Sequence, residues 1–418
     1  MAEDPTGSKA PTVAVAGADF GWGSSGKLSA VVTALRARSV RPPRFVGLAS
    51  SLGRPVLAEH GIDRWYDVPA DDPAAVAEVV RAEGVTAGLV VLEGPAAMAL
   101  EAAGVPTVFV DSLPFLWTEG DLPGLPLDVS VYCAQRCVEL PPECRDVLAS
   151  VANLHWVGAV VANGRMPDSR MPGDRLSGDR LSGGGPSATG RAPDGLVRRA
   201  LLNLGGLRSP HLPDWTRYPR LVVPAALAAL EAFGVEEVHV AGNVPDGIVS
   251  GLRPGSGPGS ALRVTAGPLG HGAFLDRLAD CDVLVTSPGL TTLLEAGALA
   301  APVVCLPPQN LSQIFNGRFH SSAVGADVRV RWPDEVFREE SVLENRASED
   351  TALRMIYGGI AGADTARVRP ALSRALLAAL GRARDGADWK GLTDAVGTDG
   401  ADRVARHVLT LMARAAHH

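Results

Sequence analysis

Short apolar segments alternate with stretches rich in alanine and leucine along most of the chain, and this alternation restricts the fold more than any other feature. In the first half the apolar segments read TVAVAGA, RFVGLAS, AGLVVLEG and PTVFVDS. Strands that are apolar throughout are typical of a sheet buried on both faces, and intervening helical stretches of about 10 to 20 residues indicate βαβ units. We therefore predict an α/β fold with a parallel sheet.

The same alternation returns in the second half of the chain. The predicted strands are RRALLNLGG, EVHVAGN, CDVLVTS and APVVCLP, with PAALAALEAFG and TTLLEAGALA as helices between them. Because 418 residues exceed the size at which one hydrophobic core keeps growing, we expect two domains. The predicted boundaries are 10–162 for the N-terminal domain, 198–385 for the C-terminal domain, and 386–418 for a helical segment that packs on a domain.

The stretch between the two halves, residues 163–197, has a different composition. It contains the degenerate five-residue repeat RMPDS-RMPGD-RLSGD-RLSGG and is rich in Gly, Pro, Ser and Asp. A segment with so few apolar side chains has little to bury. We expect a flexible insertion there, either merely tolerated or acting as a hinge.

Charge and cysteine content restrict the partners. A net charge of -7 provides no basic field for nucleic acid or an anionic membrane, so we expect small-molecule partners. The protein partner that we consider is a second copy of the chain, in a homodimer. The polar start MAEDPTGSKAPT and the lack of an apolar run of about 18 residues favour a cytoplasmic protein. Five cysteines without a C-x-x-C pair favour neither disulfides nor zinc, and no metal ion is predicted.

A turn between strand and helix in the second half has the features of an anion site. The predicted strand Val283–Thr286 runs into Ser287–Gly289, and a helix begins near Leu290. The first turn of a helix exposes unpaired backbone N–H groups at the positive end of its dipole. Because Thr291 and Thr292 add hydroxyl groups there, we expect this turn to bind a diphosphate.

Polar side chains follow on the same helix and after the next strand. Glu295 projects from the next turn of the helix and is placed to accept hydrogen bonds from the hydroxyls of a ribose. After the predicted strand Val303–Leu306 come Gln309, Asn310 and Gln313. Ligands of parallel sheets bind at the carboxyl ends of the strands, and carboxamides can hold sugar hydroxyls without adding charge.

The order of these motifs resembles the donor-substrate half of GT-B glycosyltransferases, especially the MurG-type UDP-sugar transferases. The patterns that carry the resemblance are T-x-x-E-A-x-A-x-x-x-P and P-x-x-x-x-Q. It implies two Rossmann-like domains that face an interdomain cleft, and an inverting, metal-independent transfer from a UDP-sugar that needs no cofactor. The donor-substrate residues it implies are Gly205, Gly206, Arg208, Leu269, His271, Ser287, Gly289, Leu290, Thr291, Glu295, Gln309, Asn310 and Gln313. The family's usual acid before the last glutamine is replaced by Ser312, for which Asn310 could substitute.

The glycine-rich loop GADFGWGSSGKLS matches three nucleotide-binding patterns. Residues Gly21–Gly26 spell the dinucleotide fingerprint G-x-G-x-x-G, and Gly21–Lys27 spell most of a P-loop. A dinucleotide site needs an acid after the second strand, and FVGLASS has none. A P-loop needs Ser or Thr after the lysine, where Leu28 stands, so a P-loop-like ATP- or GTP-binding protein remains only the alternative from another class.

In the family that the chain resembles, this loop faces the phosphates and the acceptor across the cleft. Its bare N–H groups and Lys27 could stabilise the departing diphosphate, while Asp19 could serve as the base, with Asp111 and Glu119 as rivals. The predictions from the N-terminal half are Asp19, Lys27 and Glu119 as catalytic residues, Gly23, Ser24, Ser25 and Gly26 as donor-substrate contacts, and Asp111, Phe115 and Trp117 as acceptor contacts.

The loop also resembles a narrower group, the cytosylglucuronate and hydroxymethylcytosylglucuronate synthases of nucleoside-antibiotic pathways. This resemblance implies UDP-glucuronate as donor and cytosine as acceptor, with Arg318 or Lys27 meeting the glucuronate carboxylate, and Asp19 or Glu119 contacting cytosine. Transfer of a sugar to another small natural product is the nearest alternative.

Overall fold

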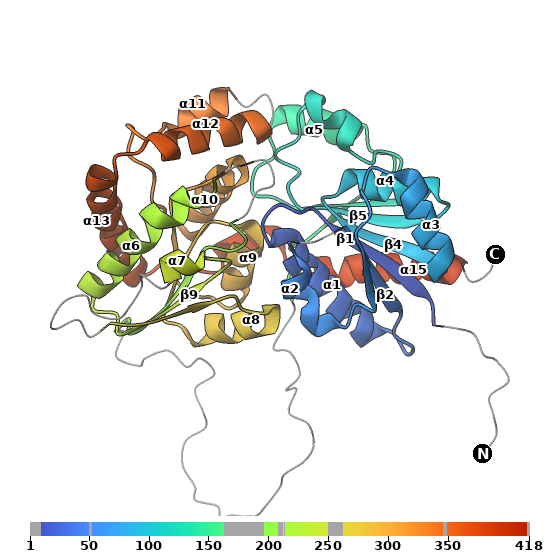
Figure 1. Cartoon of the computed structure of the whole chain (residues 1–418), viewed down its shortest axis with the longest axis horizontal. Coiled ribbons are helices and arrows are strands. Elements are labelled where there is room, and N and C mark those ends of the chain that lie inside the picture. The colour runs from blue at the N-terminus through green and yellow to red at the C-terminus, as the bar shows by residue number, and fades with distance from the viewer. Residues whose placement is uncertain are drawn as a thin grey trace, which may run out of the picture.

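A computed structural model describes residues 10–49, 52–162, 196–207, 212, 214–249, 262–345 and 349–415. Two α/β units lie side by side, each with a parallel sheet between helices (Figure 1). The expected insertion at 163–197 falls almost entirely outside these residues, as does Arg208. The α/β prediction with two parallel sheets is confirmed.

The N-terminal unit contains a parallel sheet with the strand order β3-β2-β1-β4-β5-β6-β7. Its strands are β1 (Thr12–Gly17), β2 (Arg44–Leu48), β3 (Arg64–Tyr66), β4 (Val85–Val91), β5 (Thr107–Asp111), β6 (Val131–Gln135) and β7 (Leu154–Val157). The central strands β1, β4 and β5 are buried at every residue except Thr86, as continuous apolar runs require. The direction of strand progression reverses between β1 and β4.

Helices cover both faces of this sheet. They are α1 (Gly23–Arg38), α2 (Arg54–Leu57), the 3₁₀ turn η1 (Ala58–His60), α3 (Pro73–Glu83), α4 (Gly94–Ala102), the 3₁₀ turn η2 (Glu119–Gly124) and α5 (Pro142–Ala149). Local sequence sets some of the ends: Asp72 caps α3 by accepting hydrogen bonds from Ala74 N at 3.0 Å and Ala75 N at 3.1 Å. Gly84 ends the helix in the left-handed conformation, with φ 62°.

The C-terminal unit has a second parallel sheet with the order β10-β9-β8-β11-β12. Its strands are β8 (Arg199–Asn203), β9 (Glu237–Ala241), β10 (Arg263–Gly267), β11 (Val283–Thr286) and β12 (Val303–Cys305). Strand β11 has the bounds that the sequence predicts, whereas β12 ends one residue before the expected Leu306. Here the reversal falls between β8 and β11.

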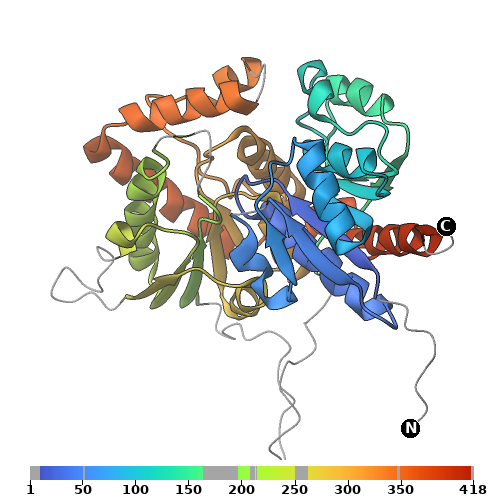
Figure 2. The ribbon, with the colours of Figure 1, turned by 45° about the vertical axis from the view of Figure 1, so that its right-hand side comes forward.

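The last helix of this part of the chain returns to the N-terminal unit. The helices are α6 (Arg217–Phe233), α7 (Asp246–Val249), α8 (His271–Asp280), α9 (Leu290–Ala298), α10 (Leu311–Val324), α11 (Glu339–Glu344), α12 (Glu349–Gly362), α13 (Thr365–Arg384), α14 (Gly391–Val396) and α15 (Gly400–Ala415). Helix α13 packs on α6, while α15 lies against the N-terminal unit, where Figure 2 shows it in red. Val404, Val408 and Leu411 join the core that contains Val13 and Leu35. Within the described residues, no helix has the length and apolar character needed to cross a membrane.

The seam between α15 and the N-terminal unit gives a stability prediction. Val408 is fully buried, so Val408→Ala removes two buried carbon atoms and leaves a cavity. We expect a loss of about 2 kcal/mol in the free energy of unfolding, measured by urea denaturation. The exposed neighbour Arg406 provides the control, because Arg406→Ala should change stability by less than about 0.5 kcal/mol. Equal effects of the two substitutions would show that α15 is not held by this buried face.

Candidate functional site

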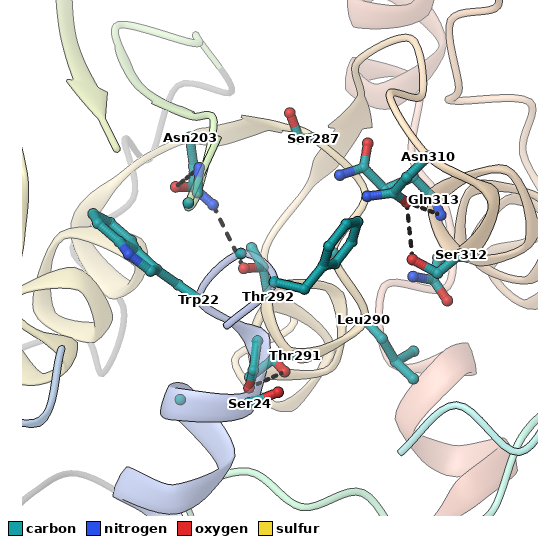
Figure 3. A pocket seen from close by; sticks show the side chains of 18 of the residues that line it. Trp22, Ser24, Asn203, Ser287, Leu290, Thr291, Thr292, Asn310, Ser312 and Gln313 are labelled. Carbon is teal, nitrogen blue, oxygen red and sulfur yellow. Dashed lines mark hydrogen bonds between the residues drawn. The ribbon is translucent and has the colours of Figure 1, made fainter. Parts of the chain in front are cut away.

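A pocket lies between the two units, at the carboxyl ends of both parallel sheets. Its lining comes from the loops after β1, β4, β5, β8, β11 and β12 and from the starts of α1, α8, α9 and α10 (Figure 3). Open α/β sheets bind ligands where the direction of strand progression reverses. Both reversal points open onto this pocket, which makes it the candidate site.

Two helices begin at the pocket without any acidic side chain in their first turns. Helix α1 starts at Gly23 after Trp22, and α9 starts at Leu290 after Gly289. Within the described part of the chain, neither preceding residue caps its helix with a side chain, so no cap accepts from the first backbone N–H groups. Two positive dipole ends therefore meet at one place, which favours a bound anion.

The glycines of the opening loop allow the two units to approach closely. A Cβ atom on Gly206 would lie 2.8 Å from Gly21 C and from Trp22 Cδ1. A Cβ atom on Gly26 would lie 3.2 Å from Thr291 Cγ2. Gly21 also has φ 66°, a conformation that suits glycine. The spacing that resembles a nucleotide fingerprint thus serves, at least in part, the contact between the units.

Lys27 is buried at this contact, with 1% of its surface exposed. Its Nζ donates a hydrogen bond of 2.7 Å to Thr291 Oγ1, which in turn donates to Gly23 O at 3.2 Å. Burial lowers the pKa of Lys27 to about 8, although the charge of Glu295 opposes that shift. Lys27 lies in the second turn of α1 rather than at its start, so the loop before it does not have the P-loop arrangement.

Glu295 lies one turn beyond Thr291 on α9 and is 4% exposed. Its Oε1 is 2.6 Å from Nε2 of His271, the first residue of α8. Within the described residues no hydrogen bond involves Glu295 Oε2, and the residue lines the pocket. One carboxylate oxygen is therefore held by the protein, and the other is available to a ligand.

The polar cluster after β12 is built around a helix cap. Asn310 Oδ1 accepts hydrogen bonds from Gln313 N and Ser312 Oγ, both at 2.9 Å (Figure 3). Gln313 Oε1 accepts from Gln309 N at 3.0 Å, and Gln309 Oε1 accepts from Tyr357 OH at 3.0 Å. Both glutamines keep their side-chain NH₂ groups for a ligand, whereas the Asn310 oxygen is used to begin α10.

Other predicted donor-substrate residues also line the pocket. They are Gly23, Ser24, Gly26, Gly205, Leu269, His271, Ser287, Gly289, Leu290 and Thr291. Ser25 is buried and is not part of the lining. Sequence reasoning missed Asn203, which ends β8 and donates from Nδ2 to Thr286 Oγ1 at 3.1 Å. An asparagine at the end of a predicted strand was a signal that could have identified Asn203. Sequence reasoning also missed Tyr357, for which the sequence offers no comparable signal.

The structure argues against two of the three expected acceptor contacts, Phe115 and Asp111, whereas Trp117 is partly exposed. Phe115 is fully buried and packs against Phe315 and Phe319, so it has no free face on which an acceptor could stack. Asp111 is also fully buried, accepting hydrogen bonds from Trp117 Nε1 at 2.7 Å and from the hydroxyl of Tyr132 at 2.9 Å. Burial raises the pKa of Asp111 to about 6. Asp111 thus holds the loop after β5 together, while Phe115 packs that loop against α10.

The charged residues predicted as base or as carboxylate partner do not themselves line the pocket, apart from Lys27. Glu119 is exposed on η2, and Arg318 pairs with Glu339 at 3.2 Å; neither lines the pocket. Asp19 accepts from Leu52 N at 2.9 Å and lies between two lining residues. Sequence reasoning missed Glu93, an acid two residues after the end of β4. Burial, followed by the charges of Asp19 and Asp71, raises the pKa of Glu93.

The cysteines and metal-binding side chains add no further centre. All five cysteines are free thiols, and four of them are buried. Burial raises the pKa of Cys305 to about 12, which keeps its thiol protonated and unreactive. In the described ranges, no three His, Cys, Asp or Glu side chains come together in a way that could hold a metal ion.

The burial of Lys27 gives a prediction on pH dependence. Folding lowers the pKa of Lys27 from 10.5 to about 8, so its charge destabilises the folded state at neutral pH. This cost disappears as the pH rises from about 8 to 10.5, which makes stability increase there. Relative to Lys27→Met, the wild type should gain about 3 kcal/mol of unfolding free energy across this range, measured by denaturant titration. A difference that stays constant with pH would contradict the burial of a charged lysine.

Comparisons with known proteins show the fold. No family model matches the sequence, and no curated protein matches it at a significant level. The glycotransferase of kitacinnamycin is 15% identical, with 97% of this chain and 100% of that protein covered and a TM-score of 0.51. The Arabidopsis thaliana protein UGT89C1, solved with UDP, is 13% identical, with 98% and 100% covered and a TM-score of 0.51. The expected GT-B fold, with two Rossmann-like domains, is thereby confirmed.

Proposed function

We propose that this chain is a UDP-sugar-dependent glycosyltransferase with an inverting, metal-independent mechanism. The observation that carries the proposal is the meeting of two uncapped helix N-termini with the buried ammonium of Lys27, one helical turn from the Glu295 carboxylate. One helical turn, about 5.4 Å, separates the anion site at the start of α9 from Glu295, which suits the diphosphate and ribose of a single nucleotide. The GT-B fold and the UDP bound to UGT89C1 support the same assignment.

The donor substrate would lie along α9 and the start of α10. The diphosphate accepts hydrogen bonds from the first N–H groups of α9 and lies against Lys27, while the ribose hydroxyls donate to Glu295 Oε2. The sugar faces the NH₂ groups of Gln309 and Gln313, which donate to its hydroxyls. The neutral lining here suits a polyol ring.

The transfer needs a base and a stabilised leaving group. The acceptor attacks the anomeric carbon from the face opposite the diphosphate, and the carbon–oxygen bond to the β-phosphate breaks with its electron pair on that phosphate. Lys27 and the N–H groups of α9 stabilise the added negative charge. The acceptor proton passes to a carboxylate at the carboxyl edge of the N-terminal sheet, for which Asp19 and Glu93 are the candidates.

The finer assignment, glucuronate transferred to cytosine, is supported by the loop resemblance alone. Among the described lining residues, Lys27 is the only Lys or Arg. A glucuronate carboxylate would therefore have to share Lys27 with the diphosphate, because Arg318 is paired with Glu339 and Glu340. Mass analysis of products from cytosine with UDP-glucuronate, and separately with UDP-glucose, tests this choice directly. A product from UDP-glucose alone would remove the glucuronate assignment and leave the glycosyltransferase proposal intact.

The assigned ribose contact gives a binding prediction. UDP should raise the melting temperature and bind more tightly than 2′-deoxyuridine diphosphate, because Glu295 accepts from the ribose hydroxyls. Glu295→Ala should weaken UDP binding about tenfold and remove the preference over the deoxy form, as measured by calorimetry. Glu231→Ala, on the exposed side of α6, is the control that should bind as the wild type does. Stabilisation by ATP with Mg²⁺ but not by UDP would overturn the proposal in favour of the P-loop-like alternative.

The choice of base gives a kinetic prediction. Asp19→Asn or Glu93→Gln should lower kcat by at least about a hundredfold while leaving UDP affinity within about twofold of the wild type, because a base acts on the acceptor proton. The variant with this behaviour identifies the base. If both variants keep their turnover, the base does not belong to this carboxylate pair.

A further inference from the structure

A continuous chain of four side chains crosses from one unit to the other beside the pocket. Ser29 Oγ is 2.6 Å from His60 Nε2 and 2.6 Å from His271 Nδ1, and His271 Nε2 is 2.6 Å from Glu295 Oε1. His60 and Ser29 belong to the N-terminal unit, whereas the other two belong to the C-terminal unit. Each of the four residues is less than 10% exposed.

A neighbouring contact fixes the same elements against each other. Glu59, which precedes His60 in η1, accepts a hydrogen bond of 3.0 Å from Gly272 N in the first turn of α8. The carboxylate thereby lies at the positive end of α8. The turn η1 is docked on the helix that begins with His271, which keeps His60 and His271 on either side of Ser29.

The protons on these four side chains can be arranged so that every hydrogen bond has one donor and one acceptor. Burial lowers the pKa of His271, but the charge and hydrogen bond of Glu295, and then the charge of Glu59, outweigh it, so the pKa is raised overall. Burial, with Arg36 and His271, lowers the pKa of His60 to about 4. A protonated His271 donates to both Glu295 and Ser29, and the Ser29 hydroxyl then donates to neutral His60. If His271 loses its Nδ1 proton, the two bonds at Ser29 reverse their direction and all groups remain paired.

We propose that Ser29 and His60 are positioning residues for the donor nucleotide, which act through His271 to aim Glu295 Oε2 at the ribose hydroxyls. The assignment rests on the proposed function, since it concerns the same nucleotide site. Glu295 has one oxygen on His271 and one toward the pocket, so the orientation of the imidazole ring sets the orientation of the carboxylate. That ring is held from its other nitrogen by the opposite unit. Ribose recognition by the C-terminal unit therefore depends on a hydroxyl and an imidazole of the N-terminal unit.

The role of Ser29 and His60 is distinct from simply holding the units together. A closing contact would affect every ligand of the cleft alike, whereas a positioning contact affects only ligands that carry the ribose hydroxyl. Pyrophosphate, 2′-deoxyuridine diphosphate and UDP separate the two effects. Pyrophosphate tests the anion site alone. The difference in affinity between UDP and 2′-deoxyuridine diphosphate reports the hydrogen bond from the 2′-hydroxyl to Glu295.

The experiment compares Ser29→Ala, His60→Leu and His60→Gln with the wild type by titration calorimetry against these three ligands. Ser29→Ala and His60→Leu should lower UDP affinity about tenfold, leave pyrophosphate within about twofold, weaken deoxy-UDP, which keeps only its 3′-hydroxyl, less than UDP, and bring the preference for UDP over deoxy-UDP close to one. His60→Gln, whose amide can reach the Ser29 hydroxyl, should recover most of that preference. Thr33→Ala is the matched control on α1, because its hydroxyl donates to the Ser29 carbonyl and not to the side chains that link Ser29 to Glu295, and it should bind as the wild type does.

Each other outcome has a distinct meaning. A wild-type protein that does not bind UDP overturns the proposed function. UDP binding by the wild type with an unchanged UDP preference in Ser29→Ala and His60→Leu overturns the positioning role alone. An equal loss for all three ligands also overturns it, because the chain would then only hold the cleft closed. Should Ser29→Ala fail to fold, the His60→Leu and His60→Gln pair decides between these outcomes.

Discussion

The ammonium of Lys27, held by Thr291 from a segment 264 residues away, is the interaction on which the arrangement of the cleft depends. It lies where α1 and α9 begin, so a buried cation faces two positive helix ends. Glu295 is the opposing charge that acts on it. Burial lowers the pKa of Lys27 even though Glu295 opposes that shift, and an anionic ligand would relieve the excess of positive potential.

The hydrogen bond between Lys27 and Thr291 can form only because the two units approach each other closely. Gly26 and Gly206 lie where a side chain would press into the opposite unit, and Gly21 borders that unit in a backbone conformation that suits glycine. Helix α15 returns to the N-terminal unit and joins its core. The cleft is therefore built jointly, with the glycine-rich loop as one wall. A nucleotide bound there would be recognised mostly by the C-terminal unit, and the N-terminal unit would contribute charge, orientation and the base.

The local patterns of the sequence carried much of this picture, because strand and helix periodicity and uncapped helix starts are properties of short segments. Strand β11 and the start of α9 agree with prediction, and the motif around Glu295 leads to the pocket. Phe115 could not be placed in the same way, since its burial depends on aromatic partners that arrive from a distant helix. The partners of Lys27 and Ser29 likewise come from the other unit, and no spacing along the chain reveals them.

The position of the diphosphate tests the account most directly, and a crystal structure of the complex with UDP would measure it. The account predicts phosphate oxygens within about 3.2 Å of Lys27 Nζ and of the first backbone N–H groups of α9, with a ribose hydroxyl on Glu295 Oε2. A UDP molecule whose phosphates contact neither Lys27 nor the start of α9 would contradict it.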